Sequence, residues 1–216
     1  MKLLRLISIL LTIGVFSCNS VSGKTENSAE TTKVEDTVTK TENPQPAKQT
    51  EENQYVGNCV RGQAEPIVKR NVYPNTTFAL QSDKLTSYET VTFGNKDKLI
   101  IYNWGCEYYM LTFRFETSRF QEDVNNLAFW YLKAHILMTE IRKGLDTPFV
   151  TIKELTTLKK ITEKKIKTNP ESFKLGEEID CSEDDSEIRN FITVDKIEKL
   201  TEKKYAIEIS FSTGPL

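Results

Sequence analysis

Apolar residues recur at every second position through much of the segment 55–116, a spacing typical of β-strands with one buried face. The clearest case is residues 107–116, where alternate positions hold Tyr109, Leu111, Phe113 and Phe115. Segments rich in β-branched and aromatic residues predict further strands at residues 67–72, 77–81, 87–93 and 98–104. The sequence Gly-Asn-Lys-Asp at 94–97 predicts a turn between the last two.

The spacing becomes helical after residue 117. Ser118 and Gln121 have the spacing of a capping box, which predicts a helix start there. Apolar residues then follow at intervals of three and four from Val124 to Ile141, and Gly144 is a stop signal. The apolar arc is wide, so we expect this helix to be buried on more than one side.

A second capping box, Thr151 with Glu154, opens a shorter predicted helix that has a lysine-rich outer face and ends before Asn169. Alternating residues then predict a hairpin of two strands, 188–199 and 204–211. We therefore predict one α+β domain at residues 55–216. Its antiparallel sheet has about six to eight strands, and two helices are inserted between an N-terminal meander and a C-terminal hairpin.

The first residues have the layout of a secretion signal. Lys2 and Arg5 precede an apolar run at 7–16 that is too short for a permanent membrane helix, which needs about 20 residues. The run leads into Val15-Phe16-Ser17-Cys18, which resembles the lipobox of bacterial lipoproteins. An ordinary signal peptide with a bystander cysteine and an uncleaved anchor are the alternatives.

The resemblance implies that residues 1–17 are removed and that Cys18 becomes the lipid-modified first residue of the mature chain. Because each buried methylene contributes about 0.8 kcal/mol, several acyl chains together form a strong membrane anchor. Asn19 stands where an aspartate would favour retention in the inner membrane of some Gram-negative bacteria. The expected location is therefore the outer membrane, facing the periplasm or the cell surface.

Residues 18–54 differ in composition from the rest of the chain. Thr, Glu, Lys and Ser dominate, and aromatic residues are absent before Tyr55, so we expect a disordered tether. A flexible chain of roughly 36 residues reaches about 30–36 Å. Asp36-Thr37-Val38 within it resembles an O-glycosylation consensus of some Gram-negative bacteria, but chance is the better explanation for a three-residue match in a Thr-rich segment.

Charge and cysteine content narrow the possible partners. Without Lys2 and Arg5 the chain has 27 basic and 31 acidic residues, a net charge of about −4, and no basic stripe that would indicate a nucleic-acid partner. Three cysteines remain, Cys59, Cys106 and Cys181, and an oxidising compartment favours one disulfide. Cys59–Cys106 is our first choice, with Cys181 as an alternative partner for either.

Residue types that usually carry catalysis are scarce. His135 is the only histidine and lies in the middle of the first predicted helix, where a packed structural role is expected. No serine elbow, phosphate loop or dinucleotide fingerprint occurs, so no cofactor is expected. A weak alternative is a calcium site in the acidic run that includes Asp180, Glu183, Asp184 and Asp185, which lacks the pattern of a known calcium loop.

The segment 103–109 contains a candidate recognition surface. Trp104, Tyr108 and Tyr109 surround Gly105, and such side chains dominate binding hot spots; they are equally consistent with core residues beside a bulge. The sequence thus favours a non-catalytic module that binds or inhibits another envelope protein. A carboxylate-dependent enzyme acting on envelope polysaccharide and a structural subunit of an envelope or secretion complex are the alternatives.

Overall fold

The structure is a computed structural model and describes residues 59, 61–183 and 186–215. Cys18, the signal segment, the predicted tether and Asp36-Thr37-Val38 lie outside the described residues. None of the helices within the described ranges has the length and apolar content needed to cross a membrane.

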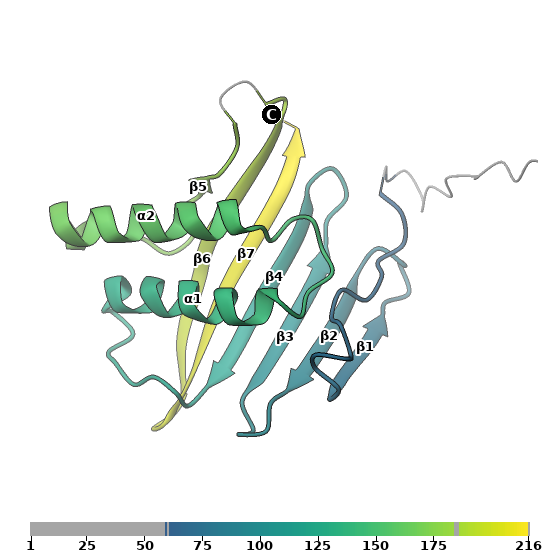
Figure 1. Ribbon diagram of the computed structural model, residues 1–216, viewed down its shortest axis with the longest axis horizontal. Coiled ribbons are helices and arrows are strands. Elements are labelled where there is room, and N and C mark those ends of the chain that lie inside the picture. The colour runs from purple at the N-terminus through teal and green to yellow at the C-terminus, as the bar shows by residue number, and fades with distance from the viewer. Residues whose placement is uncertain (1–58, 60, 184–185, 216) are drawn as a thin grey trace, which may run out of the picture. The chain divides into compact units, whose positions relative to one another are not determined.

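Seven strands form one antiparallel sheet in the order β1-β2-β3-β4-β7-β6-β5 (Figure 1). Their bounds are β1 Thr76–Leu80, β2 Ser87–Thr92, β3 Lys98–Trp104, β4 Tyr109–Thr117, β5 Ile179–Asp180, β6 Ile188–Thr201 and β7 Lys204–Pro215. The first four strands follow one another as a meander, and the β6–β7 hairpin then pairs with β4. The predicted α+β architecture is confirmed.

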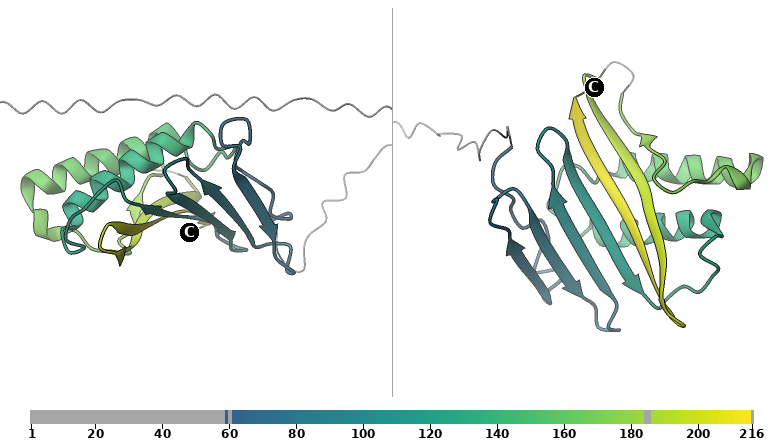
Figure 2. Two further views of the ribbon diagram at one scale, coloured as in Figure 1. Left: turned by 90° about the horizontal axis from the view of Figure 1, so that it is seen from below. Right: turned by 180° about the vertical axis from the view of Figure 1, so that it is seen from behind.

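Two helices lie between the meander and the hairpin in the chain, α1 at Leu127–Arg142 and α2 at Ile152–Thr168, and the short 3₁₀ helix η1 at Pro170–Ser172 follows. Both long helices pack on the same face of the sheet (Figure 2). The capping box predicted for the second helix is present, with Thr151 as N-cap and Glu154 binding back to its N–H. These reciprocal bonds fix the start of α2.

The core lies between the helices and one face of the sheet. Alternate strand residues point into it because successive side chains of a strand face opposite sides. The largest fully buried side chains come from both layers: Trp130, Tyr131, Met138, Ile141 and Leu158 from the helices, and Leu99, Ile101, Leu111, Phe113, Ile192, Ile207 and Ile209 from the strands. We call the side of the sheet on which the helices pack the covered face.

Two local predictions were wrong, each because a carboxylate binds the backbone. Residues 67–72 form only the isolated bridge Val68–Leu145, since the N–H groups of Ile67 and Val68 donate to the buried Glu89 carboxylate. Burial raises the pKa of Glu89 although those hydrogen bonds lower it.

The Ser118–Gln121 capping box does not form either. Asp97 accepts the backbone N–H of Ser118 at 3.0 Å and its hydroxyl at 3.1 Å. The first helix therefore starts later, and its N-cap is Asn126, whose side chain accepts from the N–H of Phe129. In effect Asp97 fastens the turn between β2 and β3 to the chain that leaves β4.

Candidate functional site

The side of the sheet away from the helices is not covered by any element of the described chain (Figure 2). Residues that alternate with the core positions point to this side, which we call the open face. They include Tyr88, Tyr102, Trp104, Thr112, Arg114, Glu208 and Ser210. Most are partly exposed, and Tyr88 is 40% exposed. A half-exposed face with this many aromatic and polar side chains is the candidate site.

Three aromatic rings are stacked on the open face. The centroids of Tyr88 and Tyr102 are 4.7 Å apart with planes 13° from parallel, and those of Tyr102 and Trp104 are 5.7 Å apart with planes 16° from parallel. Tyr88 and Tyr102 are direct cross-strand partners on β2 and β3, which brings their rings together. We call these three residues the aromatic row.

The stacking decides what the aromatic row can bind. The faces of the middle ring, Tyr102, are occupied by its two neighbours, so this ring presents its edge and hydroxyl group, whereas the end rings, Tyr88 and Trp104, are each stacked on one face only. Ring edges carry partial positive charge and favour carbonyl or carboxylate oxygens and aliphatic groups. Burial and the neighbouring Tyr88 raise the pKa of Tyr102, which keeps its hydroxyl protonated at neutral pH.

A chain of hydrogen bonds continues from the aromatic row across the sheet. Trp104 Nε1 donates to Thr112 Oγ1 at 3.3 Å, Thr112 and Ser210 share a hydrogen bond of 2.8 Å, and Ser210 Oγ donates to Asp195 Oδ2 at 2.6 Å. Because Ser210 gives its only proton to Asp195, Thr112 must be the donor to Ser210. In each of these hydrogen bonds the donor therefore lies on the Trp104 side and the acceptor on the Asp195 side. The bonds run in one direction across the open face, from β3 to β6.

An irregularity in β6 supports this arrangement. The register shifts between Val194 and Lys196, so Asp195 is the extra residue of a β-bulge. Val194 stays on the covered face and is fully buried, whereas Lys196 pairs with Glu208. The bulge lets Asp195 reach Ser210 without removing Lys196 from the open face.

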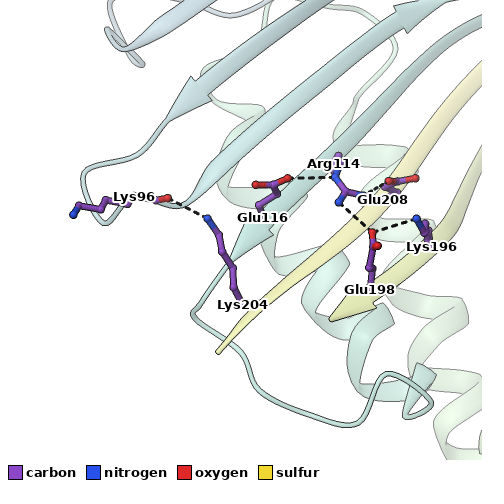
Figure 3. Close-up of polar contacts among 7 residues, drawn as sticks. All are labelled: Lys96, Arg114, Glu116, Lys196, Glu198, Lys204 and Glu208. Carbon is purple, nitrogen blue, oxygen red and sulfur yellow. Dashed lines mark hydrogen bonds and ion pairs between the residues drawn. The ribbon is translucent and has the colours of Figure 1, made fainter. Parts of the chain in front are cut away.

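Two residues along β4 from Thr112, Arg114 is the centre of an ion-pair network, which is drawn in Figure 3. Arg114 binds Glu208, contacts Glu198 at 3.1 Å and lies 3.5 Å from Glu116, and Lys196 contacts Glu198 at 3.1 Å. Burial would lower the pKa of Arg114, but its hydrogen bonds to Glu208 and Glu198 outweigh this and raise it. Hydrogen bonds from Lys196 and Arg114 lower the pKa of Glu198. The Glu198 carboxylate is therefore held in the ionised form.

The structure separates the three residues of the predicted recognition surface. Trp104 lies on the open face, as described above. Tyr109 lies on the covered face, where its ring packs on Phe149 with centroids 4.4 Å apart. Tyr108 is 44% exposed, but its hydroxyl is bonded to the carbonyl of Pro215.

Gly105 and Gly214 explain the backbone around Tyr108. Gly105 has a positive φ of 96°, and a Cβ there would lie 1.9 Å from the Tyr108 carbonyl oxygen. At Gly214 a Cβ would lie 2.4 Å from the Tyr108 ring. Tyr108 thus closes one end of the sheet rather than extending the aromatic row.

The cysteines fasten the start of the domain to the β3 end. Cys59 and Cys106, the pair favoured by the sequence, form a disulfide with Cα atoms 5.4 Å apart. Beside it the Arg61 guanidinium donates to the carbonyl oxygen of Trp104 at 2.8 Å, which helps to hold Trp104 in place. Cys181 is buried and free, and burial together with the nearby Glu154 carboxylate raises the pKa of its thiol to about 12.

The remaining chemical candidates are His135 and the acidic run. His135 lies on α1, half-buried, and burial and Lys159 lower its pKa. In the acidic run, Asp180 pairs with Arg189 and Glu183 with Lys153, while Asp184 and Asp185 lie outside the described residues. No group of three or more His, Cys, Asp or Glu in the described part of the chain is arranged to hold a metal ion.

A pocket of about 440 Å³ lies on the helix side, between α1 and the turn joining β2 and β3. Its apolar lining comes from Tyr73, Phe93, Phe115, Leu137 and Ile141. At its rim Arg119 is bound to Glu140 by two hydrogen bonds of 2.6 and 2.8 Å. Asp97 in its wall is fully engaged by hydrogen bonds from Thr117, Ser118 and Asn95. Asp97, Arg119 and Glu140 in the lining of this pocket thus already have polar partners within the protein.

Comparisons of the chain with protein-family models, with curated proteins and with solved structures gave no match. The functional conclusion therefore depends on the geometry of the open face. Sequence reasoning found Trp104 but missed Tyr88, Tyr102, Thr112 and Ser210. The sequence signal that could have found them is the set of polar and aromatic residues at the positions between the core residues of each strand.

Proposed function

We propose that this protein is an outer-membrane lipoprotein, anchored through Cys18, whose domain is a non-catalytic binding module that recognises another envelope protein through the open face. The observation that carries the proposal is the aromatic row together with the hydrogen-bonded chain that leads from it to Asp195. Tyr and Trp are the residues most enriched at binding hot spots.

The partner should offer oxygen acceptors and aliphatic groups. Tyr88 and Tyr102 present ring edges and hydroxyls, which match backbone carbonyls and small apolar side chains of a protein surface. The neighbouring ion pairs of Arg114 with Glu198 and Glu208 are satisfied internally and partly exposed. They should therefore contribute specificity at the rim more than affinity.

The same geometry speaks against a carboxylate-dependent glycosidase. Such an enzyme needs a carboxyl with a raised pKa to act as the acid. On the open face, Glu198 has a lowered pKa because of Lys196 and Arg114. Glu89 has a raised pKa, but it is buried on the other side of the sheet and is occupied by the N–H groups of Ile67 and Val68.

The test is affinity capture from envelope extract. The bait is the chain from residue 18 onward with Cys18→Ser, which keeps it in solution, compared with the same bait carrying Tyr88→Ala and Tyr102→Ala. A matched control carries Lys160→Ala and Lys164→Ala, two exposed positions on α2. We expect one stoichiometric protein with wild type and control, and its loss with the tyrosine variant.

Recovery of no stoichiometric protein would contradict the proposal, and so would a protein that the tyrosine variant retains. A multiprotein assembly retained by every bait would instead favour a structural subunit. Mass spectrometry of the mature N-terminus tests the anchor: we expect a lipidated Cys18, and an unmodified thiol would exclude it.

A further inference from the structure

The two edges of the sheet are built differently. At one edge β5 pairs with β6 only through Ile179 and Asp180, and beyond it the Gly176 N–H donates to the Val194 carbonyl at 2.9 Å. The rest of β6 is interrupted by register shifts at Val194/Lys196 and Lys199/Thr201. Coverage, bulges and charged residues are the devices by which proteins prevent unwanted strand pairing at an edge.

In the part of the chain that the structure describes, the opposite edge, β1, has none of these devices. Its sequence, Thr-Thr-Phe-Ala-Leu, contains no charge and no proline. Its pairing with β2 runs without a register shift from Thr76↔Val91 to Leu80↔Ser87. An uncharged, regular edge strand is a template for pairing with another strand.

The hydrogen bonds show which β1 groups are free to pair. Thr92 N donates to the Asn75 carbonyl, and Gln81 N donates to the Thr86 carbonyl. Since inward-bonded and outward-pointing residues alternate in an antiparallel strand, Thr77 and Ala79 bond to β2. The N–H and C=O groups of Thr76, Phe78 and Leu80 then point outward, and within the described residues no other strand pairs with them.

We infer that β1 pairs with β1 of a second copy of this chain. An antiparallel pair centred on Phe78 is two-fold symmetric, and it places Thr76 of each copy opposite Leu80 of the other. All outward groups then have partners in the same alternation. Because β1 has no charge, the two copies meet without like-charge repulsion.

The pairing would also enlarge the candidate site. On the open face, exposed Thr77 and Ala79 separate the edge from Tyr88, which is the cross-strand partner of Ala79. The two aromatic rows would therefore flank the two-fold axis on one continuous open face. A five-residue edge buries less than a standard interface, so we expect a weak, concentration-dependent dimer in solution.

The test is sedimentation equilibrium of the chain from residue 18 onward with Cys18→Ser, over a wide concentration range. Phe78→Pro removes the outward N–H of each copy, whereas the matched control Phe78→Ala removes the same ring but keeps that N–H. We expect Phe78→Pro to weaken the dimer about tenfold or more relative to Phe78→Ala, since two hydrogen bonds are lost.

A second pair of variants tests the register of the β1–β1 pairing without altering the backbone. Ala79→Lys adds a charge at an exposed position and should abolish the dimer. Adding Thr77→Glu to it should restore the dimer, because residue 77 of one copy faces residue 79 of the other. A chain that is monomeric at all concentrations, or a dimer unaffected by Phe78→Pro and Ala79→Lys, would overturn the inference. No envelope protein enters this experiment, so its outcome is independent of the proposed function.

Discussion

Phe113 and Thr112 are neighbours on β4, yet they face different environments. Phe113 is fully buried on the covered face and packs edge-to-face on Phe211 with centroids 5.7 Å apart. Thr112 is half-exposed on the open face and joins Trp104 to Ser210 through hydrogen bonds. The same strands thus supply packing on one side and directed polar contacts on the other.

The difference separates stability from recognition. On the covered face, burial of apolar area provides the free energy of folding at about 25 cal/mol per Å². On the open face, stacked rings and ion pairs contribute less because they remain in contact with water. Substitutions on the open face should therefore change binding at small cost in stability, and those on the covered face should do the reverse.

The largest expected effect comes from Phe113→Ala. Truncating a fully buried phenylalanine loses transfer energy and leaves a cavity, so the free energy of unfolding should fall by about 3–5 kcal/mol. Thr112→Ala, one residue away, should cost about 1 kcal/mol. Urea unfolding of both variants measures this, and equal losses would show that the two faces do not differ as described.

Glu89→Ala tests a polar group on the covered face. The backbone N–H groups of Ile67 and Val68 would lose their acceptor, at about 1–3 kcal/mol for each buried donor. Removing a desolvated carboxylate with a raised pKa offsets part of this, so we expect a loss of about 2–4 kcal/mol. Glu116→Ala on the open face is the control, and its loss should be below about 1 kcal/mol. A smaller loss for Glu89→Ala than for Glu116→Ala would be contrary to this view.

The contribution of Asp97 to the stability of the fold should depend on pH. Burial would raise the pKa of Asp97, but hydrogen bonds from Thr117, Ser118 and Asn95 outweigh it and lower the pKa. A carboxyl with a lowered folded-state pKa stabilises the fold above its unfolded pKa, and this stability is lost as the pH falls through the folded value. Asp97→Asn should therefore cost about 1–2 kcal/mol at pH 7.

The cost of Asp97→Asn should shrink as the pH falls below about 4. Urea unfolding of wild type and variant at pH 7, 4 and 3 measures the difference in their free energies of unfolding. This range spans the pKa of an aspartate in the unfolded chain, which is about 4. A difference that is constant over this range would mean that the charge of Asp97 does not stabilise the turn.

The smallest expected effect on stability is that of Trp104→Phe. The variant keeps an aromatic ring beside Tyr102 but lacks the N–H that donates to Thr112. We expect the free energy of unfolding to change by about 0.5–1 kcal/mol, the net value of one partly exposed hydrogen bond. A fall in the free energy of unfolding as large as that of Phe113→Ala would show that Trp104 stabilises the fold as a core residue does.

The sequence predicted the covered face well and the open face poorly. Alternation along β4 and β7 and the Thr151–Glu154 capping box are local signals, and the structure confirms the elements they predicted. The stack of Tyr88 on Tyr102 depends on strand register, which is set by contacts distant in sequence. The failed Ser118–Gln121 capping box has the same cause, because Asp97 from another turn binds Ser118 instead.

Tyr109 illustrates the remaining difficulty. It is adjacent to Tyr108 and equally aromatic, so composition alone grouped it with Trp104 as a recognition residue. Strand geometry places it on the covered face against Phe149, while Tyr88, 16 residues before Trp104 in the chain, lies on the open face with it. The face on which a residue lies is set by how the strands pair, and a short stretch of neighbouring residues does not reveal that pairing.

The most direct test of the open face as a recognition surface is the affinity of the captured envelope protein for wild type and for the Tyr88→Ala/Tyr102→Ala variant, measured by calorimetry beside urea unfolding of both. We predict that binding weakens about tenfold or more, the usual cost of removing hot-spot aromatics, while the variant remains folded. Unchanged affinity in a folded variant would contradict the account.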